Sequence, residues 1–273
     1  MHKIKTYMVN PERIIPNKLY KYYSINNFFE DVVKTHSCWF SRPQDFNDPF
    51  DCVFDVSIGN SSKEIMSNME KSFMSQFLEE YLLEQNNYEL NDGVRKIMEN
   101  PILLKKIINW VHGYYIDQNI GVYCLSEDPS NILMWSHYAN SHKGVCIEYN
   151  IPRGGFFYNN LLPVQYKKHY PKFELSDYIG EDNIMFKMHQ QVLCTKSVLW
   201  KYEKEWRVIT DEGYGLKEFN KEDVTKVIFG VKTSDEDKER IISLFKDNGY
   251  VDVVFYRCSM SDKAFALNIV EYA

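Results

Sequence analysis

Short apolar runs that alternate with helical stretches of uneven length constrain the fold of this 273-residue chain most strongly. The runs are rich in β-branched and aromatic residues and are bounded by Gly, Pro, Asn or Asp, which is typical of strands. We predict strands at 18–24, 37–41, 121–126, 145–149, 162–166, 205–210, 224–229 and 251–256. Helices are predicted at about 28–33, 131–139, 183–196 and 235–248, the first of them capped by Ser24. This order predicts an α+β fold, in which helices pack against a mixed, mainly antiparallel sheet.

The segment 61–119 differs from its surroundings, because its periods are helical and Glu, Lys, Met and Leu are frequent in it. We expect a helical insertion at about 61–119, interrupted near Gly93 and Pro101. No repeat, low-complexity tract or Pro/Gly-rich linker divides the sequence. We therefore predict one domain that spans residues 1–273.

Net charge, the length of apolar runs and cysteine spacing indicate which partners we expect: nucleic acid, membrane or metal. A net charge of −6 disfavours nucleic-acid binding by bulk electrostatics. No run approaches the roughly 18 apolar residues of a membrane span, and the first residues lack the apolar stretch of a signal peptide, so we expect a cytoplasmic protein without a membrane partner. The six cysteines are scattered and form no zinc-type spacing, which predicts structural thiols and no metal site.

Four segments carry polar side chains that an apolar core would not need. The candidate binding residues in them are Lys21, Tyr22, Ser24, Ser41, Asn47, Asp48, Asp51, Ser126, Trp135, His137, Tyr138, His142 and Arg207. The turn before Pro49 is either a rigid corner tied to backbone amides or a presented polar group, in which Asp48 and Asp51 share Lys21 or Arg207 as a basic partner. The two histidines are either ordinary or contact an anion or a nucleotide.

Glu203 and Glu205 are the candidate catalytic residues. If a strand already runs from 202 to 207, alternation places both carboxylates on one face, where repulsion and burial raise the pKa of one of them. A carboxylate of that kind suits general acid–base chemistry. The alternative is a solvated edge on which Lys201, Lys204 and Arg207 neutralise the two acids.

Five motifs follow one another along the chain: Leu-Tyr-Lys-Tyr, Phe-Asn-Asp-Pro-Phe-Asp, Cys-Leu-Ser-Glu, Met-Trp-Ser-His-Tyr-Ala-Asn-Ser-His-Lys-Gly-Val-Cys-Ile-Glu-Tyr and Tyr-Glu-Lys-Glu-Trp-Arg. In this order they closely resemble the bacterial DUF2971 family over residues 18–256. That family is named for want of a known function. The resemblance therefore implies kinship and no particular activity.

A weaker resemblance is to the ADP-ribosyltransferase fold, in which an early strand contacts NAD, a middle strand carries a Ser and a later strand carries a catalytic Glu. The matching positions are Lys21 with its neighbours, Ser41 or Ser126, and Glu203-x-Glu205. The sequence departs from the pattern at Lys21, which stands where His or Arg would contact NAD. Lysine neutralises a phosphate but lacks the planar bidentate geometry of arginine.

This resemblance implies an NAD-using transferase or glycohydrolase, with NAD as a substrate. Glu205 would stabilise the positive charge that develops on ribose as nicotinamide leaves, Glu203 would orient the acceptor and Lys21 would hold the pyrophosphate. Tyr22 or Trp135 would stack on nicotinamide or adenine.

Two other classes stay open. The chain could be a non-catalytic module that binds a small-molecule nucleotide or a protein, such as a sensor or a phage-defence component. It could also be a metal-dependent nuclease that uses Asp48, Asp51, His137 and His142.

Overall fold

The computed structural model describes residues 14–57, 100–174 and 184–272, which fall into two compact units. Within these ranges, the first unit comprises 14–41, 121–164 and 198–272, and the second comprises 42–57, 100–120, 165–174 and 184–197. The single domain over 1–273 stays a prediction.

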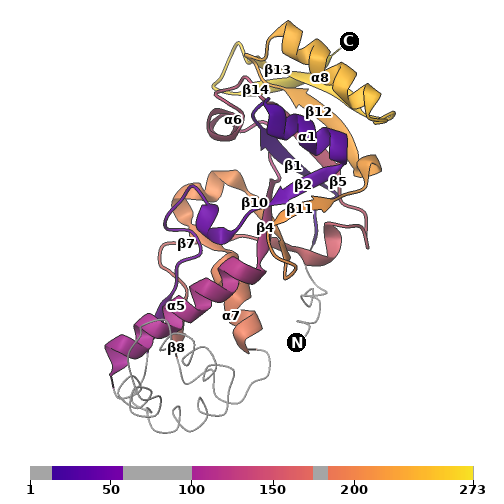
Figure 1. The fold of residues 1–273 in the computed structure, drawn as a ribbon. Helices are drawn as coiled ribbons and strands as arrows, with labels where there is room; N and C mark the ends of the chain where they lie inside the picture. The colour runs from indigo at the N-terminus through magenta and orange to yellow at the C-terminus, as the bar shows by residue number, and fades with distance from the viewer. Residues whose placement is uncertain (1–13, 58–99, 175–183, 273) are drawn as a thin grey trace. The chain divides into compact units, whose positions relative to one another are not determined.

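The first unit is built on an eight-stranded sheet (Figure 1). In spatial order its strands are β14 (Leu267–Glu271), β13 (Val254–Met260), β12 (Val224–Phe229), β5 (Val145–Asn150), β1 (Lys18–Tyr23), β4 (Gly121–Ser126), β10 (Glu205–Thr210) and β6 (Leu161–Pro163). Neighbouring strands are antiparallel except β12 and β13, which are parallel. The mixed, mainly antiparallel sheet confirms the predicted α+β class.

Helices cover both faces of this sheet. The α1/α8 face packs against α1 (Asn27–Thr35) and α8 (Asp235–Asp247), and the α6 face packs against α6 (Ile132–Tyr138). Side chains along β1 alternate between the two faces. Leu19 and Tyr23 pack in the larger core under α1 and α8, whereas Tyr22 packs against Trp135 on the α6 face. The central strand is therefore apolar on two sides.

Local chemistry sets the ends of these elements. The N-cap of α1 is Asn26, whose side-chain oxygen accepts the backbone N–H of Phe29 at 2.9 Å, so the prediction of Ser24 as the cap was wrong. The predicted strand 162–166 is divided into β6 and β7 (Gln165–Lys167), which pair with different strands. The predicted last strand is β13, and β14 follows it in the sequence.

Short elements complete the first unit. A two-stranded ribbon joins β2 (Ser37–Phe40) to β11 (Gly215–Glu218). Three 3-10 helices are η2 (Tyr158–Asn160), η4 (Val198–Glu203) and η5 (Lys221–Asp223). The ribbon strand β11 was not predicted.

The described residues of the second unit form two short parallel strand pairs and two α-helices. Its elements are η1 (Pro43–Asp45), β3 (Asp55–Ser57) paired with β8 (Lys172–Glu174), β7 paired with β9 (Thr195–Ser197), α5 (Pro101–Asn119) and α7 (Ile184–Leu193). Of the predicted insertion at 61–119, residues 58–99 lie outside the described residues and 101–119 are helical. An ion pair between Lys105 and Asp55, 2.5 Å long, links α5 to β3.

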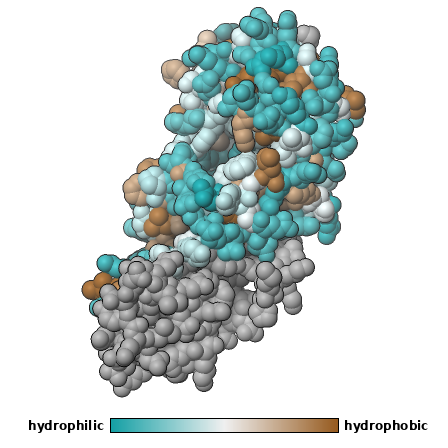
Figure 2. All heavy atoms as spheres, in the orientation of Figure 1, coloured by the Kyte–Doolittle hydropathy of each residue, from teal (hydrophilic) through white to brown (hydrophobic). Residues whose placement is uncertain are grey.

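Polar side chains cover most of the visible face of the described residues, with apolar side chains scattered among them (Figure 2). None of the helices in the described ranges has the length and apolar character needed to span a bilayer.

Gly144 marks a close approach of backbone segments between α6 and β5, and replacing it tests this packing. A Cβ added there would clash with the carbonyl oxygen of Tyr23. We expect Gly144→Ala to lower the free energy of unfolding by about 1–3 kcal/mol in urea titrations followed by circular dichroism. The control is Gly113→Ala in α5, where a Cβ meets no atom within 4 Å and should stabilise by up to about 1 kcal/mol. Equal stability of the two variants would contradict the close approach.

Candidate functional site

The central strands of the sheet separate from each other next to Tyr20. β1 pairs with β5 along its whole length, from Lys18 to Tyr23. In the described strands β1 meets β4 at one register pair, Tyr20 with Ser126. Farther along, β4 bonds instead to the backbone of Ser41, which exchanges two hydrogen bonds of 2.9 Å with Val122. We call the divergence of β1 and β4 beyond this pair the fork.

Lys21 fills part of the fork. Its Nζ donates a hydrogen bond of 2.8 Å to the carbonyl oxygen of Cys124 on β4 and lies 4.7 Å from the ring centre of Tyr123. Alternation places Lys21 on the α1/α8 face, opposite to Tyr20 and Tyr22. The ammonium group therefore replaces a missing strand partner, and the side chain does not share a face with the candidate catalytic Glu205.

Across the other face, register partners form a continuous row of polar side chains. Glu205 lies opposite Ser126, Ser126 opposite Tyr20, Tyr20 opposite Glu148, and Glu148 opposite Lys226. Cross-strand partners point to the same side of a sheet, so these five side chains lie on the α6 face. We call this set the polar row.

Glu205 is fixed at one end of the polar row by an ion pair with Arg207. The Nε of Arg207 lies 2.7 Å from one carboxylate oxygen, and Nη2 lies 3.2 Å from the other. Glu205 is 6% exposed and Arg207 0%, so this bidentate pair is buried. Burial and the neighbouring Glu205 raise the pKa of the Cys124 thiol to about 12, which keeps that thiol protonated near neutral pH.

Glu203 does not alternate with Glu205 along a strand, because β10 begins only at Glu205. Glu203 ends the 3-10 helix η4, and Lys204 between them adopts a left-handed conformation with φ 45°. The predicted alternation of the two carboxylates is therefore wrong. Glu203 is nevertheless buried, and its Oε1 accepts a hydrogen bond of 2.7 Å from the hydroxyl of Tyr138.

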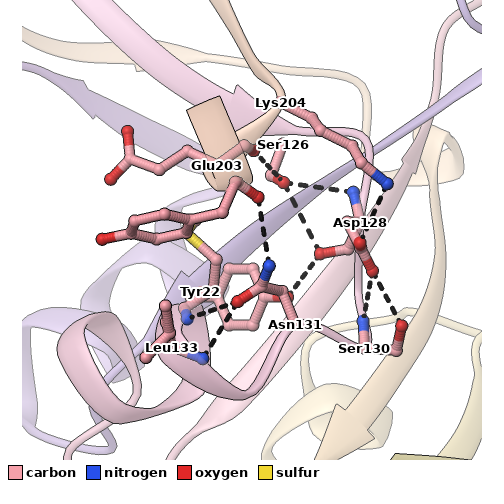
Figure 3. A network of polar contacts seen from close by, with 10 residues as sticks. Tyr22, Ser126, Asp128, Ser130, Asn131, Leu133, Glu203 and Lys204 are labelled. Carbon is pink, nitrogen blue, oxygen red and sulfur yellow. Dashed lines mark hydrogen bonds and ion pairs between the residues drawn. The ribbon is translucent and has the colours of Figure 1, made fainter. Parts of the chain in front are cut away.

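The Ser126 hydroxyl connects β4 to this turn (Figure 3). It donates to the carbonyl oxygen of Glu203 at 2.6 Å and accepts from the N–H of Asp128 at 3.1 Å. Asp128 pairs with Lys204 at 3.1 Å, and its carbonyl accepts the hydroxyl of Tyr22. The predicted residues Ser126 and Tyr22 therefore hold together the loops that carry Glu203.

A third connection comes from the start of α6. The side-chain amide of Asn131 donates to the carbonyl oxygen of Tyr202 at 3.1 Å, while its oxygen caps the helix (Figure 3). The hydrogen bond therefore joins the start of α6 to η4, and both segments lie on the α6 face.

The aromatic and histidine residues of α6 and of the turn that follows it lie in different environments. Trp135 is fully buried and donates through Nε1 to the carbonyl of Pro129 at 2.8 Å. His142 stacks on Trp135 and bonds through Nε2 to the hydroxyl of Ser136 at 3.0 Å, and burial and Lys232 lower its pKa. His137 is exposed and lies edge-on to Trp200.

The predicted residues around Pro49 belong to the second unit. The side chain of Asp48 accepts the backbone N–H of Phe50 at 2.9 Å, as the rigid-corner interpretation requires. Asp51 has Lys196 as a basic partner at 3.7 Å, in place of the expected Lys21 or Arg207. Asn47 is exposed. Ser24, in the first unit, lies half-buried just after β1.

In the described ranges, no group of three or more His, Cys, Asp or Glu side chains is arranged to hold a metal ion. All six cysteines are free thiols.

Glu148 is the polar residue that the sequence analysis missed. It is 1% exposed and accepts hydrogen bonds from Lys18 at 2.6 Å, Tyr20 at 2.8 Å and Thr225 at 2.7 Å, with Lys226 at 3.3 Å. The sequence could have indicated its importance, because Glu148 follows the apolar run Val-Cys-Ile in a predicted strand. A carboxylate at a buried strand position needs cationic or hydrogen-bonding partners.

The comparisons with known proteins agree with the sequence motifs. A family model described as "Protein of unknown function (DUF2971)" matches residues 134–208, from α6 to β10. This confirms the DUF2971 resemblance over a segment that includes Glu148, Glu203, Glu205 and Arg207. No curated protein and no solved structure matches the chain.

The buried Glu205–Arg207 pair gives a stability prediction. Arg207→Met leaves a buried carboxylate without its guanidinium, so we expect the free energy of unfolding to fall by about 3–5 kcal/mol. Arg240→Met is the control, because Arg240 pairs with Glu30 and Asp237 at the surface and should contribute at most about 1 kcal/mol. Urea denaturation measures both, and similar losses would contradict a special role for the buried pair.

Glu148 gives a pH prediction. Burial raises the pKa of this carboxyl, but hydrogen bonds from Lys18, Thr225 and Tyr20 bring it below its ordinary value. The resulting stability is present above the unfolded pKa of about 4.3 and is lost as the pH falls through the folded pKa. The stability difference between the wild type and Glu148→Gln should therefore shrink between about pH 5 and pH 3 in urea titrations. A constant difference would show that the carboxyl does not titrate as proposed.

Proposed function

We propose that the first unit is an ADP-ribosyltransferase-like transferase or glycohydrolase that takes NAD as its substrate. The observation that carries this proposal is the register of three adjacent strands: Tyr20 on the early strand, Ser126 on the middle one and Glu205 on the late one share the α6 face. The ADP-ribosyltransferase resemblance implies this order of an NAD-contacting strand, a serine and a glutamate.

In the proposed reaction, the bond between the ribose C1′ and the nicotinamide nitrogen breaks, and nicotinamide leaves with the bonding electrons. Positive charge develops on the ribose, and the carboxylate of Glu205 stabilises it. Arg207 holds both oxygens of that carboxylate, so little reorganisation is required when the charge appears. Water or an acceptor hydroxyl then bonds to C1′ and loses its proton to solvent.

The other groups near Glu205 take supporting roles. The Tyr138–Glu203 pair would orient the acceptor, and the half-buried rings of Tyr20, Tyr138 and Tyr202 would offer stacking surfaces on the α6 face. In this proposal Lys21 does not hold the pyrophosphate, because its Nζ donates to the Cys124 carbonyl oxygen and its side chain lies on the opposite face.

A non-catalytic nucleotide-binding module is the second candidate. The observation that favours it is that both carboxylates already accept protein hydrogen bonds, Glu203 from Tyr138 and Glu205 from Arg207. The same contacts would give a rigid binding surface without chemistry.

Nicotinamide release tests the first candidate. The purified chain is incubated with NAD alone and with protein or nucleic-acid acceptors, and nicotinamide is measured by chromatography. We expect release by the wild type and a fall of about 100-fold to 1,000-fold in Glu205→Gln, since a positioned charge is removed from the transition state. Glu212→Gln, which alters an exposed pair with Lys217, should leave the rate unchanged.

Two results would overturn the assignment: no nicotinamide release by the wild type under any of these conditions, or full activity of a folded Glu205→Gln variant. Thermal stabilisation by NAD without release would support the non-catalytic module, because a ligand that binds the folded state raises the melting temperature whether or not it reacts.

A further inference from the structure

Glu148 holds two lysines at once on the α6 face. Nζ of Lys18 lies 2.6 Å from Oε1, and Nζ of Lys226 lies 3.3 Å from Oε2. The carboxylate side chain is 2% exposed, whereas the side chains of Lys18 and Lys226 are 45% and 30% exposed. One buried anion therefore fixes two ammonium groups that reach solvent.

Satisfying Glu148 does not require both cations. The hydroxyls of Tyr20 and Thr225 already donate to its oxygens, and Lys18 adds an ion pair. Lys226 brings the group to a net charge of +1, and each ammonium has three N–H donors. The side chain of Lys226 is 30% exposed, so its ammonium group can reach a ligand in solvent while one N–H remains directed at Glu148.

We propose that Lys18 and Lys226 form a phosphate-binding site, which takes the diphosphate of an extended nucleotide. Ammonium groups on flexible stems bind phosphate as point charges. The ring of Tyr256, 5.0 Å from Nζ of Lys226 and half-buried, gives the site an aromatic wall. The choice of NAD as the nucleotide rests on the proposed function, whereas the recognition of phosphate does not.

The position of the site defines the shape of its ligand. Glu148 and Glu205 lie three strand spacings apart along the polar row, which is about 14 Å at the usual distance between strands. The lysine stems shorten that span. A ligand that reaches both ends must be extended, as a dinucleotide is. These lysines, and not Lys21, would hold its phosphates.

Calorimetric titration of the full chain with ADP, inorganic pyrophosphate and adenosine tests the site. We expect ADP and pyrophosphate to bind the Lys18→Met/Lys226→Met double variant at least about tenfold more weakly than the wild type, because charge-assisted hydrogen bonds are lost. Methionine keeps the apolar stem, and the hydroxyls of Tyr20 and Thr225 still donate to the buried carboxylate of Glu148. Circular dichroism and a urea titration of the double variant establish that it is folded before ligand is added. Adenosine should bind both proteins equally, since it has no phosphate. Lys34→Met, which alters an exposed pair with Glu30, is the control.

The outcomes separate this inference from the proposed function. If the wild type binds neither ADP nor pyrophosphate, or the double variant binds both as the wild type does, the phosphate site is refuted even where nicotinamide is released. A loss of affinity for adenosine equal to that for ADP also refutes it, because general damage would explain both. Lysine-dependent binding of ADP by a chain that releases no nicotinamide supports the phosphate site while the proposed function fails.

Discussion

The register pair between Tyr20 and Ser126 is the constraint on which the organisation of the first unit depends. It joins the part of the sheet from β14 to β1 to the part from β4 to β6. Beyond it the strands diverge, and the edge of β4 is completed by the backbone of Ser41 and by the Nζ of Lys21. Because unpaired backbone groups are costly when water is excluded, both contacts stabilise the fork. The same pair aligns the side chains of the polar row, so the geometry of the fork and that of the candidate site have one origin.

The buried charges of the α6 face are hard to explain by stability alone. Arg207 is fully buried against Glu205, and Glu148 is buried under two lysines and two hydroxyls. Apolar residues of similar volume usually stabilise a fold as well as such ion pairs do. Elsewhere on the same face the covered part of the sheet carries apolar side chains, for example Ile228 and Cys258. The buried charges of this face are therefore concentrated in one row, while its surroundings are apolar.

Strand existence could be predicted from sequence, whereas register could not. The predicted bounds of β4, β10 and β12 agree with the structure, because dense β-branched and aromatic runs end there at polar residues or at Gly230. The strand β14 was missed, although Leu267, Asn268 and Ile269 alternate between half-buried and exposed positions. Lys204 broke the expected Glu-x-Glu alternation, because a lysine with positive φ has no local signal. Glu148 and Lys226 became neighbours of Tyr20 only through pairing between distant strands, and single-sequence patterns do not specify such pairing.

The two ends of the polar row also differ in the charged side chains that surround them. The β10 end carries two carboxylates, Glu203 and Glu205, beside Arg207, whereas the β5 end carries two lysines, Lys18 and Lys226, around Glu148. NAD has a complementary distribution, since its nicotinamide ring is a cation and its diphosphate is an anion. Bound along the row, its reactive end would lie at Glu205 and its phosphates at the lysines, and the reverse orientation would oppose like charges. The opposed charges thus connect the catalytic proposal to the phosphate site through one ligand orientation.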